Sequence, residues 1–503
     1  MHRQRRGRAV AGRSGVSGLE LSDVALEPSL QGSEPRVTTI ETDYLVIGAG
    51  AVGMAFADTL VTESDAHITI IDRQSRPGGH WNDAYGFVAL HQPSAFYGVN
   101  SLPLGTDRKD THGVNAGLYE LASGAEVSGY YDRVMRQSLL ASGRVTYLPM
   151  TAWRDDGRAV SLMSGAQTAI TVRRKTVDTT HNSPVIPANH TPRFAVEEGV
   201  RMVPPGVLPR LWLESERPAR FVVLGAGKTA MDAIGWLLAM GTPADAIQWI
   251  KPRDSWLIDR SGTQPGEEFF DEVFGRQLAQ MRAFAQGTSP EDIFARLEAA
   301  GVVLRIDPEV MPTMFHYATI SHGEVAELRR VTNVVRKGRV TAITPEAIML
   351  EQGSEPAVPG ALYIDCTASA VEPRAAVPIF QGDRIVPQLV RVPQPCFSAA
   401  LIAFVEAHYP DDDAAKNILC RTVPFPHDLR SYLTTNIVNI MNQGGWFGDE
   451  RLGAWIRRSR LDGFGKIAAG IDRNDAARVA VLQELRATGP QAVANLMRLA
   501  AQG

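Results

Sequence analysis

A glycine-rich turn between two apolar runs constrains this chain more than any other feature. The run Tyr44–Ile47 leads into Gly48-Ala49-Gly50-Ala51-Val52-Gly53, and a second run, 67–71, ends at Asp72. Strand, glycine turn, helix, strand and acid are the order of a dinucleotide-binding βαβ unit, in which the helix N-terminus binds pyrophosphate and the acid binds a ribose hydroxyl. We therefore predict that a dinucleotide contacts Gly48, Gly50, Ala51, Val52, Gly53, Asp72 and Arg73.

The segment after Asp72 indicates which dinucleotide binds there. Gly78-Gly79-His80-Trp81 resembles the Gly-Gly-x-Trp segment that follows the ribose-binding acid in flavin-containing monooxygenases and Baeyer–Villiger monooxygenases, the class B flavoprotein monooxygenases. In those families the first βαβ unit binds the ADP half of FAD. The resemblance therefore implies that FAD is the cofactor and that Gly79, His80 and Trp81 lie beside it. The alternative is a flexible turn with Trp81 in the core.

A second glycine turn follows the apolar run Phe221–Leu224. It reads Gly225-Ala226-Gly227-Lys228-Thr229-Ala230, with alanine at the third glycine position, which the motif tolerates. The next apolar run ends on Lys251-Pro252-Arg253 instead of an acid, and cations can pair with the 2′-phosphate of NADP. We predict NADPH here, contacted by Gly225, Gly227, Lys228, Thr229, Lys251 and Arg253. An ordinary solvated strand end is the alternative for the two cations.

Two dinucleotide units in 503 residues predict an α/β fold with two Rossmann-type domains, the NADPH domain inserted in the FAD domain, and a helical C-terminal region. The expected boundaries are a disordered basic tail at 1–36, the FAD domain at 37–215 and 346–395, the NAD(P)H domain at 216–345, and helices at 396–503. The run 361–364, which closes on Asp365-Cys366-Thr367, resembles the late strand that completes the FAD fold in the resembled families. Asp365 is therefore expected to contact FAD.

The loop after Trp81 supplies the candidate catalytic residues. Residues 82–101 are dense in aromatic and hydrogen-bonding side chains, with turn formers that disfavour a helix. In the resembled families this stretch lies near the isoalloxazine ring, so His91, Gln92 and Asn100 are candidates for contact with flavin or substrate. His91 is equally well explained as a structural histidine.

Composition excludes several classes of protein. A net charge of −4 gives no general argument for nucleic acid, and no apolar run approaches the ~20 residues of a membrane helix. The chain has only three cysteines, Cys366, Cys396 and Cys420, and no close pair, so it cannot be a flavin disulfide reductase, and a cytoplasmic location is the default. We also predict no metal site, because His316 and His322 lack a carboxylate at ligand spacing.

Two nucleotides in one chain suit hydride transfer from NADPH to FAD. The resemblance implies a monooxygenase in which O₂ forms a C4a-(hydro)peroxyflavin that oxygenates a small organic substrate. The histidine-containing signature of both families is missing between the two turns, where residues 190–199 stand, which indicates a divergent relative. A flavin dehydrogenase or reductase without oxygen insertion and a non-catalytic nucleotide-binding protein are the alternatives. The C-terminal helices could form a homodimer.

Overall fold

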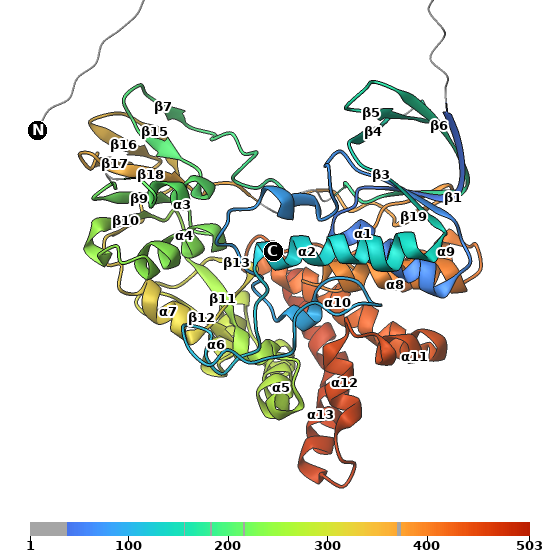
Figure 1. Ribbon diagram of the computed structural model, residues 1–503. Coiled ribbons are helices and arrows are strands. Elements are labelled where there is room, and N and C mark those ends of the chain that lie inside the picture. Colours follow the sequence, from blue (N-terminus) through green and yellow to red (C-terminus); the bar gives the residue numbers. More distant parts are fainter. Residues whose placement is uncertain (1–37, 155, 182–183, 215–216, 370–373, 503) are drawn as a thin grey trace, which may run out of the picture.

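The computed structural model describes residues 38–154, 156–181, 184–214, 217–369 and 374–502. The predicted basic tail, 1–36, lies outside the described residues. Two lobes, each built around a parallel sheet, stand side by side above a group of helices (Figure 1).

The first lobe contains the predicted βαβ unit. β1 (Thr38–Ile47) leads through α1 (Ala51–Glu63) to β2 (Ile68–Ile71), and β1 pairs in parallel with β2. The sheet order is β19-β20-β6-β1-β2-β3. Its other strands are β3 (Val145–Leu148), β6 (Gln167–Asp178), β19 (Phe380–Gln381), β20 (Arg384–Ile385) and the attached hairpin of β4 (Thr151–Arg154) and β5 (Arg158–Ser161). This part of the fold prediction is confirmed.

Helices from both ends of the chain cover this sheet. α1 packs against α8 (Pro395–His408), and their buried side chains, such as Phe56 and Phe404, belong to one core. Because α8 buries residues around its whole circumference, it is an interior helix of this lobe. The same lobe includes α2 (Gly124–Arg133), continued by helical turns to Ser142, α9 (Asp413–Leu419) and α11 (Glu450–Arg458).

The second lobe contains a five-stranded sheet of order β14-β10-β9-β18-β8. Its neighbours all run parallel, and α4 (Lys228–Ala239) connects β9 to β10. The strands are β8 (Met202–Val203), β9 (Phe221–Leu224), β10 (Ile247–Ile250), β14 (Val334–Val335) and β18 (Leu362–Asp365). The nearby helices α3 (Leu208–Leu211) and α7 (His322–Leu328), and a small sheet of β7 (Ala195–Val196), β15 (Val340–Ile343), β16 (Ala347–Leu350) and β17 (Gly353–Pro356), complete the lobe.

β18 corrects one prediction. The run that ends at Asp365 forms a strand, but it pairs with β9 in the second sheet, so the expectation that it completes the first sheet is wrong. A short strand that is apolar on both faces fits any buried position in a parallel sheet, and its residues do not specify the neighbour. The chain returns to the first sheet at β19 and β20, where β20 pairs with β6.

A third sheet joins the C-terminal helices. β11 (Ser255–Asp259) lies between β12 (Val303–Leu304) and β13 (Met314–Ile320), and Trp256 shares a core with Tyr432 and Leu496. The helices around this core are α5 (Phe270–Gln286), α6 (Pro290–Ala299), α10 (Leu429–Gly448) and α13 (Ala476–Ala500), with α12 (Gly463–Gly470) nearby. The predicted helical C-terminal region is confirmed. None of the helices in the described ranges is both long and apolar enough to cross a membrane.

Candidate functional site

The first glycine turn brings the predicted acid against the start of α1. A Cβ added to Gly53 would lie 2.0 Å from the carbonyl oxygen of Gly48, so only glycine lets the helix begin this close to β1. Asp72 follows β2, and its Oδ2 accepts a hydrogen bond from the Ala49 amide at 2.5 Å. Burial raises the pKa of Asp72, whereas the amides of Ala49 and Gln74 favour its charged form. The carboxylate therefore sits directly beside the turn.

The Gly78-Gly79 segment packs on this same turn. The amide of Gly78 donates to the carbonyl of Ala49 at 2.9 Å, and a Cβ on Gly79 would lie 3.0 Å from the Cα of Gly50. The indole of Trp81 is fixed by a hydrogen bond from Nε1 to the hydroxyl of Tyr97, 2.7 Å long. The structure thus brings the two glycine segments and Trp81 together, with Trp81 packed against the core of the first lobe.

The helices that follow the two glycine turns begin with backbone amides that no side chain caps. α1 and α4 start after Gly50 and Gly227, with no side-chain cap and no acid in the first turn. In contrast, α2 and α10 begin with capping boxes that use their first amides. A Cβ on Gly227 would meet no atom of the described chain within 4 Å, so space is open before α4. Uncapped amides and the positive end of the helix dipole suit a phosphate at each position.

The cations at the end of β10 are arranged differently from the sequence prediction. Lys251 is 2% exposed, and its Nζ lies 2.5 Å from Oδ1 of Asp254, so its charge is already compensated. Burial lowers the pKa of Lys251. Arg253 is exposed, and Arg336 reaches the same edge from the end of β14, with Nε 2.8 Å from Oδ2 of Asp254. Arg336 directly follows a short valine run, and this strand-end position could have marked it in the sequence as a further candidate cation.

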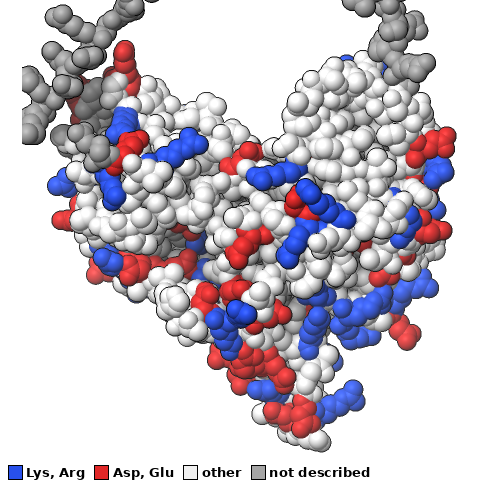
Figure 2. Space-filling model, in the orientation of Figure 1, with Lys and Arg blue, Asp and Glu red and all other residues white. Residues whose placement is uncertain are grey.

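A partly buried charge cluster joins the two lobes near the second turn. Lys228 contacts Asp232 at 2.5 Å and Glu324 at 2.9 Å, and Nη1 of the buried Arg260 contacts Glu324 at 2.6 Å. Burial raises the pKa of Glu324, but the two cations outweigh it and hold that pKa at about 2. The hydroxyl of Tyr85, from the loop of the first lobe, donates to Asp232 at 2.8 Å. Figure 2 shows a notch in the surface between the two lobes.

His91 lies at this junction. Its Nε2 is 3.6 Å from Oδ2 of Asp232, and its backbone carbonyl accepts from Nε of Arg260 at 3.0 Å. Asn100 lies elsewhere, where its Oδ1 accepts from the Ser459 hydroxyl at 2.8 Å and the Arg460 amide at 3.2 Å. The loop is therefore fastened to the second lobe at one end and to the residues after α11 at the other.

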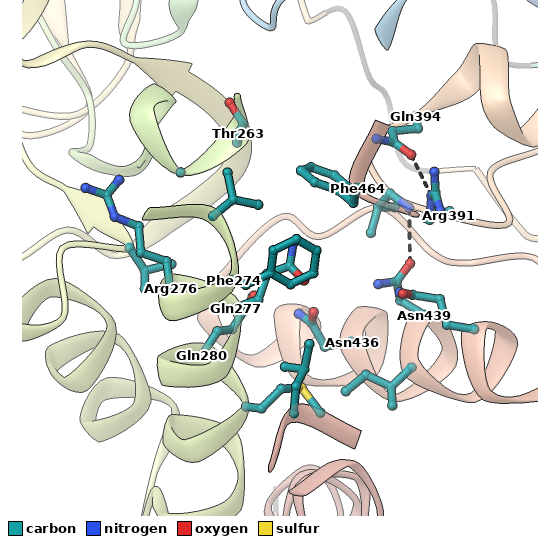
Figure 3. A pocket seen from close by; sticks show the side chains of 18 of the residues that line it. Thr263, Phe274, Arg276, Gln277, Gln280, Arg391, Gln394, Asn436, Asn439 and Phe464 are labelled. Carbon is teal, nitrogen blue, oxygen red and sulfur yellow. Dashed lines mark hydrogen bonds between the residues drawn. The ribbon is translucent and has the colours of Figure 1, made fainter. Parts of the chain in front are cut away.

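A cavity of about 1040 Å³ lies among α5, α10, α12, α13 and residues 391–394. Figure 3 shows side chains of α5 facing those of α10 and of the 391–394 segment. Its apolar lining includes Phe274 and Phe464, and its polar lining is rich in carboxamides: Gln92, Gln277, Gln280, Gln394, Asn436, Asn439 and Gln443. Tyr317 also lines it, at a positive φ of 54° in an irregular part of β13. Backbone strain of this kind concentrates at functional sites.

The loop after Trp81 connects the cavity with the first glycine turn. Gln92 and Phe96 line the cavity, and Tyr97 holds Trp81. Of the three residues predicted to be catalytic, Gln92 alone is part of this lining. Sequence reasoning missed most of the cavity because its walls combine many segments between Gln92 and Val493, and no local motif marks them.

The sequence comparisons agree with the first glycine turn. Residues 46–101 match the profile of the NAD(P)-binding Rossmann-like domain. The chain is also 47% identical over 439 residues to the uncharacterized protein Rv2000 of Mycobacterium tuberculosis, a match that covers 87% of this chain and 80% of the relative.

Comparison with solved structures gives matches of low identity to flavoproteins. The flavin-containing monooxygenase of Stenotrophomonas maltophilia is 14% identical, with a TM-score of 0.42, over 73% of this chain and 97% of that one. The cyclohexanone monooxygenase of Rhodococcus sp. Phi1 bound to NADP⁺ is also 14% identical, with a TM-score of 0.45, over 76% of this chain and 89% of that one.

Fold and site together define an α/β protein with a Rossmann-like NAD(P)-binding domain, several sheets and a helical C-terminal region. Within that class, the chain belongs to the family of the mycobacterial protein Rv2000.

Proposed function

We propose that this protein is an FAD-dependent oxidoreductase that takes hydride from NADPH and acts as a monooxygenase on a small organic substrate. The observation that carries the proposal is the pair of glycine turns, each with an uncapped helix N-terminus at the end of a parallel sheet. Two dinucleotide sites in one chain suit hydride transfer between two nucleotides. A large cavity along the loop from the first site provides room for a substrate.

The residues of the first turn fit FAD. The amides of Ala51, Val52 and Gly53 would bind the pyrophosphate, and the Asp72 carboxylate keeps lone pairs for the ribose hydroxyls. Trp81, fixed by Tyr97, would border the isoalloxazine. When bound, FAD would supply hydride acceptance and the activation of O₂.

The residues of the second turn fit NADPH. The amides at the start of α4 would bind its pyrophosphate, with the ammonium group of Lys228 nearby. The exposed Arg253, at the strand end, would pair with the 2′-phosphate. Arg336 lies at the same edge, where Asp254 and Asp307 hold its guanidinium, and the buried Lys251 is already paired with Asp254. NADPH is therefore the expected reductant.

The cavity would protect the reaction from water. A monooxygenase transfers one oxygen atom of O₂ to the substrate and releases the other as water, using the two electrons of NADPH. The reaction fails when solvent reaches the reduced, oxygen-reactive site, so a water-excluding environment is required. The apolar side chains from α5, α12 and α13 would exclude solvent, while Gln92 would orient the substrate by hydrogen bonding.

Anaerobic reduction followed by exposure to air tests this function. We expect a yellow protein whose visible absorbance is bleached by NADPH faster than by NADH. After air is admitted, a distinct transient absorption band before recovery of the oxidised spectrum supports a monooxygenase. Immediate recovery without this band supports the dehydrogenase or reductase. A protein that stays colourless after reconstitution with FAD contradicts both.

A further inference from the structure

The residues that line the large cavity include more arginines than acidic residues. Among the described residues, four arginines line it, Arg276, Arg391, Arg457 and Arg486, with two aspartates, Asp259 and Asp462. Each aspartate already has an arginine partner. Oδ2 of Asp259 lies 2.8 Å from Nη1 of Arg276, and Oδ1 of Asp462 lies 2.9 Å from Nη1 of Arg391. The lining therefore carries an excess of two positive charges, on the exposed Arg457 and Arg486, which favours an anionic ligand.

Arg391 is the cation placed to meet that ligand. It is 8% exposed, its Nε donates to Oε1 of Gln394 at 2.5 Å, and its Cζ lies 3.5 Å from the ring centre of Phe397. These contacts and the bond to Asp462 fix the plane of the guanidinium. Its Nη2 has no hydrogen-bond partner in the described chain, and less than 1 Å² of its surface is accessible, so neighbouring side chains must move before a ligand can reach it. A buried donor without an acceptor is unfavourable, so an acceptor brought by a ligand would complete the set.

The rest of the lining accepts a large apolar body. The cavity of about 1040 Å³ is at the upper end of the size range of small-molecule sites. Its apolar wall includes Phe274, Met281, Ile440, Phe464 and Val493, from α5, α10, α12 and α13. Arg391 stands across the cavity from α5 in Figure 3. A ligand could therefore contact the arginine and the apolar wall together.

We propose that the cavity binds an amphipathic carboxylic acid, with its carboxylate on the guanidinium group of Arg391 and its apolar body along α5 and α13. A carboxylate satisfies the unpaired N–H and also balances the excess positive charge, whereas a neutral carbonyl does only the former. This inference names the substrate class for the proposed oxidoreductase and rests on that function for its role in turnover. The binding itself does not require turnover.

A pair of ligands of equal length tests the proposal. We expect the purified full-length protein to bind decanoate at least about tenfold more tightly than decanamide in calorimetric titration. R391Q should lose that preference and retain decanamide binding. R282Q changes an exposed arginine of α5 that pairs with Glu484 outside the cavity lining, and it should keep the wild-type preference.

A second variant decides the result if R391Q does not fold. D462N keeps Arg391 but removes its competing carboxylate, so decanoate binding should tighten severalfold while decanamide binding stays unchanged. Equal affinity of the wild type for both ligands, or unchanged decanoate binding in D462N, would overturn the inference. Failure of NADPH to bleach the flavin would contradict the proposed function alone, because the titration measures binding without reduction.

Discussion

Gly227→Ala separates nucleotide binding at the second turn from folding. Gly227 has φ −81° and ψ 178°, a backbone conformation that alanine adopts freely, and its added Cβ meets no atom within 4 Å. The free energy of unfolding should therefore change by less than about 1 kcal/mol, the usual range for an N-cap change of this kind. The same Cβ projects into the open space before α4, where we place the pyrophosphate.

The expected loss of affinity follows from the hydrogen bonds that the methyl group would obstruct. An amide must come within about 2.7–3.2 Å of a phosphate oxygen, so even a small displacement breaks the contact. One charge-assisted hydrogen bond contributes about 1.5–3 kcal/mol, which corresponds to a roughly 10- to 150-fold rise in the NADPH concentration needed for half-maximal reduction.

Stopped-flow reduction of the anaerobic protein measures this concentration, and the visible spectrum reports whether flavin stays bound. Gly225→Ala is the contrasting variant, because Gly225 has φ +126° and its Cβ would lie 2.5 Å from the carbonyl oxygen of Cys366. It should destabilise the second lobe as well as weaken binding. If G227A is reduced with the wild-type dependence on NADPH, the phosphate does not bind at α4, and the assignment of the second turn is wrong.

Three further predictions follow from the first lobe. Gly53→Ala places a Cβ 2.0 Å from a carbonyl oxygen of the turn, so urea denaturation should show a loss of about 1–3 kcal/mol or more together with loss of FAD; wild-type stability would contradict this. Glu406→Gln removes the buried carboxylate that pairs with the buried Lys175 and Lys416, and it should lower the free energy of unfolding by about 3–5 kcal/mol. Asp411→Asn, at a side chain that is 78% exposed, should lower it by less than about 1 kcal/mol, and similar losses in the two variants would refute the idea that burial sets the strength of these ion pairs. Burial lowers the pKa of His80 to about 4, so the folded protein binds fewer protons than the unfolded chain and loses stability as the pH falls from about 6.5 to 4. His80→Gln should reduce this dependence without abolishing it, because burial also lowers the pKa of His91 and of His316; an unchanged slope of unfolding free energy with pH would show that His80 does not contribute.

The first dinucleotide unit is the part of the fold that sequence determines most completely. From Tyr44 to Asp72 the strand, turn, helix and acid are neighbours along the chain, so their local conformations bring them together. The helical spacing of residues 396–503 was sufficient for the same reason, because helical hydrogen bonds link residues only a few positions apart. The predicted cofactor contacts themselves remain predictions until binding is measured.

Tertiary structure decided every feature that depends on which distant segments become neighbours. The strand at Leu362–Asp365 could be recognised, but its place beside β9 could not, because an apolar parallel strand fits either sheet. Arg336 lies 85 residues after Lys251 (336 − 251) and shares Asp254 with it only because β14 pairs with β10. The cavity around Arg391 has no local pattern at all. Its lining is brought together by packing between distant segments, and the order of residues along the chain does not show which segments will meet.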